Sequence, residues 1–291
     1  MDLSIVLVNF NDGRRLESCL SSIAAHPPGR AHEIIVVDNA SADGSRDVVA
    51  QKFPSVRWVA NAANEGFAKA NNRGVRESRG EYLLFLNTDT VVPAGALDRL
   101  LARLKADARA GAAGPALVHD GGCQVSFGNR VSFAAQFFQK IFLNPFYKAT
   151  LRRRRAARAS GWLSAACLLC RRTAFEQAGG FDERFFIYFE DIDLCYRLRR
   201  AGWTLLFVPD VRIRHEGGST TAPRQAESRF EYRRSQLYFY AKHNSRVSHR
   251  LLRFYLALNV RGLAVRGAFR GEAGSKLREK YRRLLREGGG A

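Results

Sequence analysis

The sequence lacks any uninterrupted apolar run near the ~18 residues that a membrane-spanning helix requires, so we expect no such helix. It also lacks a basic segment followed by an apolar one at its start, which argues against a secretory signal peptide. Its five cysteines are an odd, scattered set that predicts buried, reduced thiols in a reducing cytoplasm. Cys167 and Cys170 have the spacing of a metal or redox pair, but no second pair matches them.

Two phosphate-binding glycine motifs are missing as well. No Gly-x-Gly-x-x-Gly follows the first predicted strand, and the chain has no Gly-Lys-Ser/Thr loop. Dinucleotide dehydrogenases and P-loop enzymes are therefore disfavoured. A nucleotide bound without a glycine cradle leaves its diphosphate in need of a metal ion.

Acidic residues are scarce relative to basic ones. The chain has 27 Asp+Glu against 47 Lys+Arg, a formal net charge of +20. From residue 220 onward there are 17 basic and 5 acidic residues, so +12 of the +20 lies in the last quarter. This excess implies an anionic partner, which could be nucleic acid, anionic lipid or a phosphorylated substrate. A nucleic-acid-binding protein is therefore the alternative from another functional class.

What the chain does contain is an alternation of strand and helix patterns over about its first 90 residues. Buried strands are predicted at residues 3–8, 33–37, 56–60 and 83–86, with helices between them. The alternation predicts a parallel, doubly wound α/β sheet. Each predicted strand ends in a polar loop rich in Asn and Asp, which is where such sheets bind their ligands.

The loop Asn87-Thr88-Asp89 follows the most apolar of these strands. A carboxylate at a buried strand end can hold a hard cation such as Mg²⁺, so Asp89 is a candidate metal ligand. The alternative is that Asp89 caps a helix starting near Pro93 or ends a turn. The tripeptide alone does not decide between the two.

Further blocks in the sequence carry a family resemblance. They read SIVLVNFN (4–11), VVDNASADGS (36–45), NEGFAKANN (64–72), LNTD (86–89), GGFDERFFIYFEDIDL (179–194) and HEGGS (215–219). In this order, over roughly residues 3–245, they resemble the family 2 glycosyltransferases of GT-A fold, especially the rhamnosyltransferase-like branch. The resemblance implies a mixed, mainly parallel central sheet flanked by helices. It assigns residues 1–220 to the GT-A domain, with a nucleotide-binding part at about 1–118 and an acceptor-binding part at about 119–220. Residues 221–291 would form a helical, basic C-terminal region.

The resemblance also implies a nucleotide-sugar site at the strand ends. Asp38 would bond the base or ribose, although an N-cap or Asx turn is its rival role. Gly66 would let the backbone approach the donor, or would simply start a helix. Asn87 replaces the first carboxylate of the family's Asp-x-Asp element and brings no charge. The residues assigned to the nucleotide sugar are Asn9, Asp38, Asn39, Asn64, Gly66, Phe67, Asn87 and Ser219.

The same resemblance assigns the metal and the catalytic base. Asp89 and His215 would hold Mg²⁺ or Mn²⁺, and Asp191 would act as general base with Glu190 orienting it. The rival role for this acidic group is capping of the helix that begins there. Asp193 is expected to contact Arg197, one helical turn later.

The expected reaction is an inverting transfer from a nucleoside-diphosphate sugar to a hydroxyl of a cell-surface glycan or polyprenyl-linked acceptor. The resemblance favours dTDP-L-rhamnose and leaves UDP-hexose or UDP-galactofuranose open. The arginine-rich C-terminal region predicts peripheral contact with the anionic inner face of the cell membrane, with a homodimer as its rival, and no nucleic-acid partner. Aromatic and arginine residues at 133–158 suggest either lipid contact or core packing.

Overall fold

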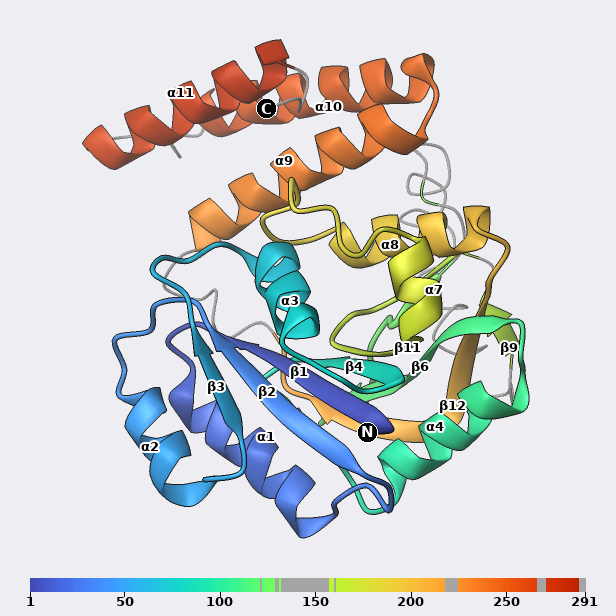
Figure 1. The fold of residues 1–291 in the computed structure, drawn as a ribbon. Coiled ribbons are helices and arrows are strands. Elements are labelled where there is room, and N and C mark those ends of the chain that lie inside the picture. Colours follow the sequence, from blue (N-terminus) through green and yellow to red (C-terminus); the bar gives the residue numbers. More distant parts are fainter. Residues whose placement is uncertain are drawn as a thin grey trace.

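The computed structural model describes residues 1–120, 122–128, 131, 157–159, 161–217, 225–265 and 271–287 (Figure 1). Most of the aromatic and arginine-rich segment predicted at 133–158 lies outside these residues, as does Ser219. The described strands are β1 (Leu3–Asn9), β2 (His32–Asp38), β3 (Arg57–Ala60), β4 (Tyr82–Leu86), β5 (Thr90–Val91), β6 (Ala110–His119), β7 (Gly122–Cys123), β8 (Phe127–Gly128), β9 (Ala157–Ala159), β10 (Trp162–Leu163), β11 (Cys167–Arg171) and β12 (Thr204–His215). The described helices are α1 (Gly13–Ala25), α2 (Ser45–Lys52), α3 (Phe67–Arg76), α4 (Ala96–Ala106), α7 (Arg172–Gln177), α8 (Glu190–Arg200), α9 (Gln225–His243), α10 (Arg246–Val265) and α11 (Gly271–Glu287).

The central sheet has the strand order β3-β2-β1-β4-β11-β6-β12-β5. Strands β3, β2, β1 and β4 pair in parallel, and so do β6 and β12. Strand β11 runs antiparallel between β4 and β6, and the short β5 runs antiparallel to β12. The prediction of a mixed, mainly parallel α/β sheet is therefore confirmed.

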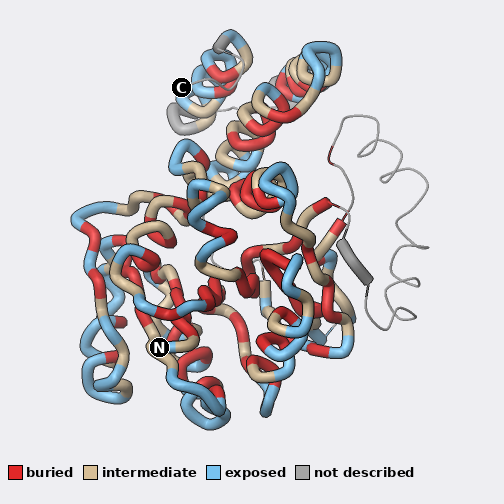
Figure 2. Tube along the Cα trace, turned by 45° about the vertical axis from the view of Figure 1, so that its right-hand side comes forward, coloured by how far each residue is buried: buried red, intermediate tan, exposed pale blue. Residues whose placement is uncertain are grey.

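Strands β1, β2, β4, β6, β11 and β12 each contribute to two hydrophobic clusters, one on each face of the sheet. In β4, Phe85 belongs to one cluster, whereas Leu84 and Leu86 belong to the other, because successive side chains point to opposite faces. Helices α1, α2 and α4 cover one face, and α3, α7 and α8 cover the other (Figure 1). Figure 2 shows the resulting buried interior enclosed by exposed helix surfaces and loops. Burial on both faces explains why these strands are continuous apolar runs.

The apolar segment at 161–171 has the pattern of one strand, which predicts a single element, but it forms two strands. Strand β10 pairs with β8 in a small separate sheet, and β11 joins the central sheet. Between them Ala165 donates its N–H to Asp191, and the Ala166 carbonyl accepts the N–H of Asn87. The break therefore turns two backbone groups toward predicted site residues. A pattern of apolar residues carries no sign of that turn.

All five thiols are free, and the prediction that they are buried holds for four of them, whereas Cys123 is half-buried. Cys167 and Cys170 lie on β11 at an odd spacing, so their side chains enter opposite clusters. They cannot form a redox pair across the sheet. Burial also raises the pKa of Cys19 and of Cys195 to about 12, which keeps these thiols protonated.

The C-terminal helices stack beside the face covered by α3 and α8. Helix α9 packs against α8 through the Phe239 and Tyr196 rings, 5.2 Å apart, and α10 and α11 pack on α9 (Figure 1). Leu237, Phe239 and Tyr240 of α9 are fully buried within the same cluster as Phe85 of the sheet. Across the parts of the chain that the structure describes, no helix is both long and apolar enough to cross a membrane.

Candidate active site

The carboxyl ends of β1 and β2 meet at one edge of the sheet. Asn9 and Asp38 are register partners there, and the Asn9 Nδ2 donates to Asp38 Oδ1 at 2.9 Å. Asp38 also accepts hydrogen bonds from the backbone N–H of Ser41 at 3.0 Å and from its hydroxyl. The predicted rival role of Asp38 in a local turn is therefore present in the structure. The Oδ1 atom of Asn9 is buried and accepts no hydrogen bond from the described residues.

Asn39 links this edge to the start of α3. Its Nδ2 donates to the carbonyl of Gly66 at 3.1 Å, and its Oδ1 accepts from Asn61 Nδ2 at 2.7 Å. Asn64 accepts the Gly66 N–H at 3.0 Å. The residues predicted to open this helix, Asn64, Gly66 and Phe67, are thus brought together with Asn39.

Gly66 has φ +83° and ψ 177°, a conformation that only glycine adopts readily. A Cβ atom there would lie 2.4 Å from the carbonyl oxygen of Phe186. The same carbonyl accepts the N–H of Phe67 at 2.6 Å. Glycine is therefore needed at position 66 because the Phe186 carbonyl lies so close, and not because of the donor or the helix start alone. It lets the aromatic loop before α8 approach the start of α3.

Asp89 and His215 face one another across the sheet edge. Asp89 Oδ1 lies 3.3 Å from His215 Nε2, and its Oδ2 accepts the N–H of Gly217 at 3.1 Å. Burial by itself raises the pKa of Asp89, but His215 and the Gly217 N–H bring it below its ordinary value, so the carboxylate is ionised. The helix after it begins at Ala96 with Gly95 as its N-cap, so the alternative role of Asp89 as a cap is wrong.

Gln124 holds the ring of His215, a contact that no pattern in the sequence indicates. Its Nε2 donates to the backbone carbonyl of His215 at 2.8 Å, and this fixes which end of the amide carries the oxygen. Its Oε1 lies 2.6 Å from His215 Nδ1 and must accept a proton from it. The ring that hydrogen-bonds Asp89 and lowers its pKa therefore carries a second proton on Nε2, whereas a ring protonated on Nδ1 alone would turn an Nε2 lone pair toward Asp89.

Two acceptors that face each other at 3.3 Å suit a shared cation. Neighbouring ligands of an octahedral Mg²⁺ lie about 3 Å apart, given metal–ligand bonds near 2.1 Å. A hydrogen-bonded carboxamide on the other ring nitrogen is the outer support that metal-binding histidines usually have. Among the described residues no group of three or more His, Cys, Asp or Glu could hold a metal. Asp89 and His215 would thus supply two ligands and leave the rest to substrate and water, and the residues fit the predicted metal.

A second carboxylate missed in the sequence lies beside this pair. Asp12, in the loop after β1, accepts the hydroxyl of Thr88 at 2.9 Å and pairs with Arg15 at 3.4 Å. Burial, aided by the charge of Asp89, raises the pKa of Asp12. The polar loop after the first strand was the available signal, but a turn explained it equally well.

Glu190 and Asp191 follow a strained turn at the start of α8. Tyr188 and Phe189 both have positive φ, 71° and 68°, which is costly for residues with bulky side chains. Asp191 accepts the N–H of Ile192 at 2.8 Å and that of Ala165 at 3.1 Å. Glu190 is 6% exposed, and its Oε2 is buried without a described partner.

These surroundings divide the charge between the two carboxyl groups. Burial, followed by the charge of Asp191, raises the pKa of Glu190 well above its ordinary value. Burial also raises the pKa of Asp191, but the two backbone N–H donors oppose this. These surroundings favour the proton on Glu190 and the negative charge on Asp191. A pair of carboxyl groups separated in this way can divide the roles of base and support.

Comparison with known proteins shows which family the chain belongs to. The family model "Glycosyltransferase like family 2" matches residues 2–246. An N-acetylglucosaminyl-diphospho-decaprenol L-rhamnosyltransferase of Mycobacterium tuberculosis is 32% identical over 262 residues, covering 84% of this chain and 85% of the relative. The chain is a family 2 glycosyltransferase.

Solved structures agree on the fold of this glycosyltransferase, which is GT-A. The mannosyltransferase of Pyrobaculum calidifontis, solved with GDP-Man and Mn²⁺, gives a TM-score of 0.61 at 17% identity, over 98% of this chain and 86% of that one. GalNAc-T7, solved with UDP, GalNAc and Mn²⁺, gives 0.59 at 20% identity, over 83% and 50%. These similarities concern the fold, and their ligands belong to those proteins.

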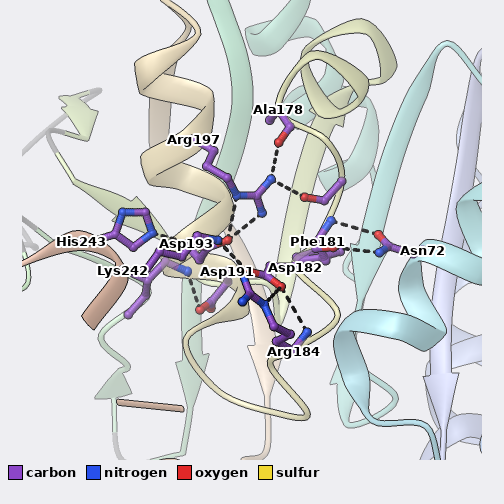
Figure 3. A network of polar contacts seen from close by, with 12 residues as sticks. Asn72, Ala178, Phe181, Asp182, Arg184, Asp191, Asp193, Arg197, Lys242 and His243 are labelled. Atoms are coloured by element: carbon purple, nitrogen blue, oxygen red, sulfur yellow. Dashed lines mark hydrogen bonds and ion pairs between the residues drawn. The ribbon is translucent and has the colours of Figure 1, made fainter. Parts of the chain in front are cut away.

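The glycosyltransferase also contains a buried charge network at the start of α8 (Figure 3). Asp193 is fully buried and pairs with Arg197 at 2.7 Å, which confirms the predicted contact. It also accepts from His243 at 2.6 Å and lies 2.7 Å from Lys242 Nζ, both at the end of α9. Asp182, in the preceding loop, holds the same lysine at 2.6 Å. The network fixes the start of α8 to α9.

Proposed function

We propose that this glycosyltransferase moves L-rhamnose from dTDP-L-rhamnose to a hydroxyl of a polyprenyl-linked or cell-surface glycan, with inversion at the sugar carbon. The similarity to the decaprenol-linked rhamnosyltransferase, which extends over 84% of the chain, supports the donor and acceptor classes. The separated Glu190–Asp191 pair is the observation that carries the chemistry. A UDP-sugar is the alternative donor.

Asp191 acts as general base in this proposal. Its ionised carboxylate, held by the N–H groups of Ala165 and Ile192, takes the proton of the acceptor hydroxyl, which then attacks the sugar carbon from the face opposite the nucleotide. A single displacement of this kind inverts the configuration. Glu190, protonated and buried beside Asp191, adds no second negative charge to the site.

The donor is held by groups at the strand ends. Asn9, Asp38 and Asn39 form the nucleotide side of the site, and Asn87 lies between this side and His215, 3.5 Å from its ring. Asp89 and His215 would hold a divalent cation, Mg²⁺ or Mn²⁺, which when bound neutralises charge on the leaving diphosphate. Ser219, also assigned to the diphosphate, lies outside the described residues.

Peripheral contact with an anionic membrane surface is part of the proposal. Helix α10 exposes Val247, Leu251, Phe254 and Leu258, which recur at the spacing of one helix face. The helix also contains four arginines and no carboxylate. An exposed apolar stripe on a cationic helix suits anionic lipid. A second copy of the chain is the rival occupant of this face.

A panel of nucleotide sugars tests the donor assignment. We expect dTDP-L-rhamnose with Mn²⁺ to raise the melting temperature of the full chain more than UDP-hexoses or UDP-galactofuranose do, because a ligand bound only by the native state stabilises it. A larger shift with a UDP-sugar would replace the proposed donor. Absence of a shift with every nucleotide sugar would contradict the proposal as a whole.

A further inference from the structure

A groove of about 510 Å³ lies between the C-terminal helices, and the donor and metal sites make no use of it. Its walls include Tyr188, Tyr232, Tyr255 and Tyr281, together with Arg229 and Arg233. Its floor contains the buried aliphatic residues Leu256 and Val260. A concave site lined mainly by aromatic and aliphatic side chains, with a few convergent charges, is typical of a ligand pocket, and the volume of this groove lies in the usual range.

One end of the groove reaches the catalytic turn. Tyr188 is in that turn, two residues before Glu190, and its ring lies 5.6 Å from that of Tyr232. Its hydroxyl is 2.7 Å from the hydroxyl of Ser228, another lining residue. Phe189, the next residue of the turn, packs 5.2 Å from the same Tyr232 ring. A molecule in the groove would therefore contact the turn that positions Asp191.

The charge of the groove is positive. Arg229 and Arg233 lie one turn apart on α9, and no carboxylate occurs among the described lining residues. Neither arginine has a carboxylate within 4.0 Å in the described parts of the chain. Glu227 and Glu231 lie on the opposite side of α9 from the two arginines, by the helical repeat. Two guanidinium groups one turn apart suit a diphosphate, whose oxygens accept paired N–H bonds.

The other end of the groove opens beside the exposed apolar stripe of α10. Tyr255 lines the groove and is itself 37% exposed, adjoining Phe254 and Leu258 of the stripe. From Val247 to Leu258 the stripe extends about 16 Å along the helix, given a rise of 1.5 Å per residue. The groove is thus lined by the paired arginines and by Tyr188 of the turn, and its lining residue Tyr255 adjoins the apolar stripe.

We propose that this groove binds the diphosphate and the first isoprene units of a polyprenyl-diphosphate acceptor. The two arginines hold the diphosphate, the tyrosine and aliphatic walls contact the chain, and the rest of the lipid continues over α10 into the membrane. The sugar beyond the diphosphate is thereby directed toward Tyr188 and the base. This inference rests on the proposed function for the acceptor class, but it concerns a site separate from the donor.

Direct binding of farnesyl diphosphate, a soluble prenyl diphosphate, to the full chain tests the groove by titration calorimetry. We expect Arg229→Gln/Arg233→Gln to weaken this binding at least about tenfold, because charge-assisted hydrogen bonds are lost. The matched control Arg282→Gln/Arg286→Gln removes two exposed arginines of α11 outside the groove and should bind as the wild type does. Equal affinity in the groove variant and the wild type would overturn the proposal.

A second variant separates the groove from charge alone. Asn259→Trp places a large side chain at an exposed lining position and leaves both arginines intact, so it should also weaken farnesyl diphosphate binding. Unchanged binding there, or inorganic pyrophosphate binding as tightly as the prenyl compound, would reduce the groove to a general anion site and contradict the assignment.

The donor readout distinguishes this test from that of the proposed function. Both groove variants should keep the melting-temperature shift caused by the nucleotide sugar. If the wild type responds to the donor but does not bind farnesyl diphosphate, the groove assignment fails and the transferase proposal stands. If it binds the prenyl compound but no nucleotide sugar, the donor proposal fails and the groove assignment stands.

Discussion

Glu190 and Asp191 are adjacent in the chain, yet two backbone N–H groups stabilise only the second as an anion. Glu190 has a buried oxygen without a described partner, and its pKa is raised chiefly by burial. In the unfolded chain the same group titrates near its ordinary value of 4.5. Folding therefore takes up a proton above that pH, and the folded state loses stability as the pH rises toward the folded pKa.

Glu190→Gln should remove this loss, because the amide has no proton to release. We expect the wild-type melting temperature to fall as the pH rises above the ordinary pKa of 4.5, and that of the variant to fall less. The control is Glu176→Gln, whose side chain is 58% exposed and should keep the wild-type slope. Parallel curves for Glu190→Gln and the wild type would contradict a protonated Glu190.

Gln124 makes the second residue-scale prediction, since it orients the ring of His215 through two hydrogen bonds. Gln124→Ala should weaken Mn²⁺ binding about 10–100-fold, the usual cost of losing the outer support of a metal ligand. Free Mn²⁺, measured by electron paramagnetic resonance, reports this without any turnover. Gln177→Ala, which removes an exposed partner of Trp203, should leave Mn²⁺ affinity unchanged. Equal affinities for Gln124→Ala and Gln177→Ala would remove Gln124 from this role.

At the scale of elements, the site depends on how the loop before α8 meets the start of α3. Phe186 approaches Gly66 so closely that no side chain fits between them. Farther along the loop, Tyr188 and Phe189 have strained backbone angles and lead directly to Glu190 and Asp191. The close approach at Gly66 therefore helps to place Asp191.

Gly66→Ala should displace this loop, lowering stability by about 1–3 kcal/mol and also reducing transfer. Gly44→Ala is the matched control, because Gly44 also has positive φ (+73°) but has no atom within 4 Å of an added Cβ. It should cost only about 1 kcal/mol and leave transfer intact. Urea denaturation and a transfer assay measure the two effects. Equal losses in both variants would argue against the steric coupling.

The strands were predictable from the sequence because burial on both faces leaves continuous apolar runs, and their polar ends marked Asp38 and Asp89. The role of Gln124 was not predictable, because Gln124 and His215 are 91 residues apart in the chain. They meet because β6 pairs with both β7 and β12. The division of 161–171 and the turn at Tyr188–Phe189 were missed for a similar reason. In both segments the direction of the backbone is set by contacts with residues distant in the sequence, so the local pattern of apolar and polar residues does not predict it.

The whole molecule has one face of unusual composition, formed by the outer side of α10. Phe254 is 65% exposed and Leu258 50%, next to the exposed Arg250 and Arg261. The buried side of the same helix contacts α9 and α11. The helix is apolar on two opposite faces, so its outer face is expected to bind a further apolar partner. In the proposed function this partner is the lipid of an anionic membrane.

Phe254→Ser/Leu258→Ser should abolish sedimentation of the protein with anionic vesicles while leaving donor binding intact. Each arginine near the surface adds about 1 kcal/mol of attraction, so neutral vesicles should bind the wild type more weakly. Val125→Ser, at an exposed apolar position elsewhere, is the control. Unchanged vesicle binding by the double variant would contradict lipid as the partner of this face. A wild-type dimer that the double variant dissociates would assign the face to a second copy of the chain.

The proposed transfer requires Asp191 as the general base, and the Asp191→Asn variant tests this requirement. The variant keeps the size of the side chain but cannot take the acceptor's proton. We expect it to bind the donor nucleotide with wild-type affinity and to lose transfer by about 10²–10⁴-fold in a single-turnover assay. Near-normal transfer by Asp191→Asn would exclude Asp191 as the general base.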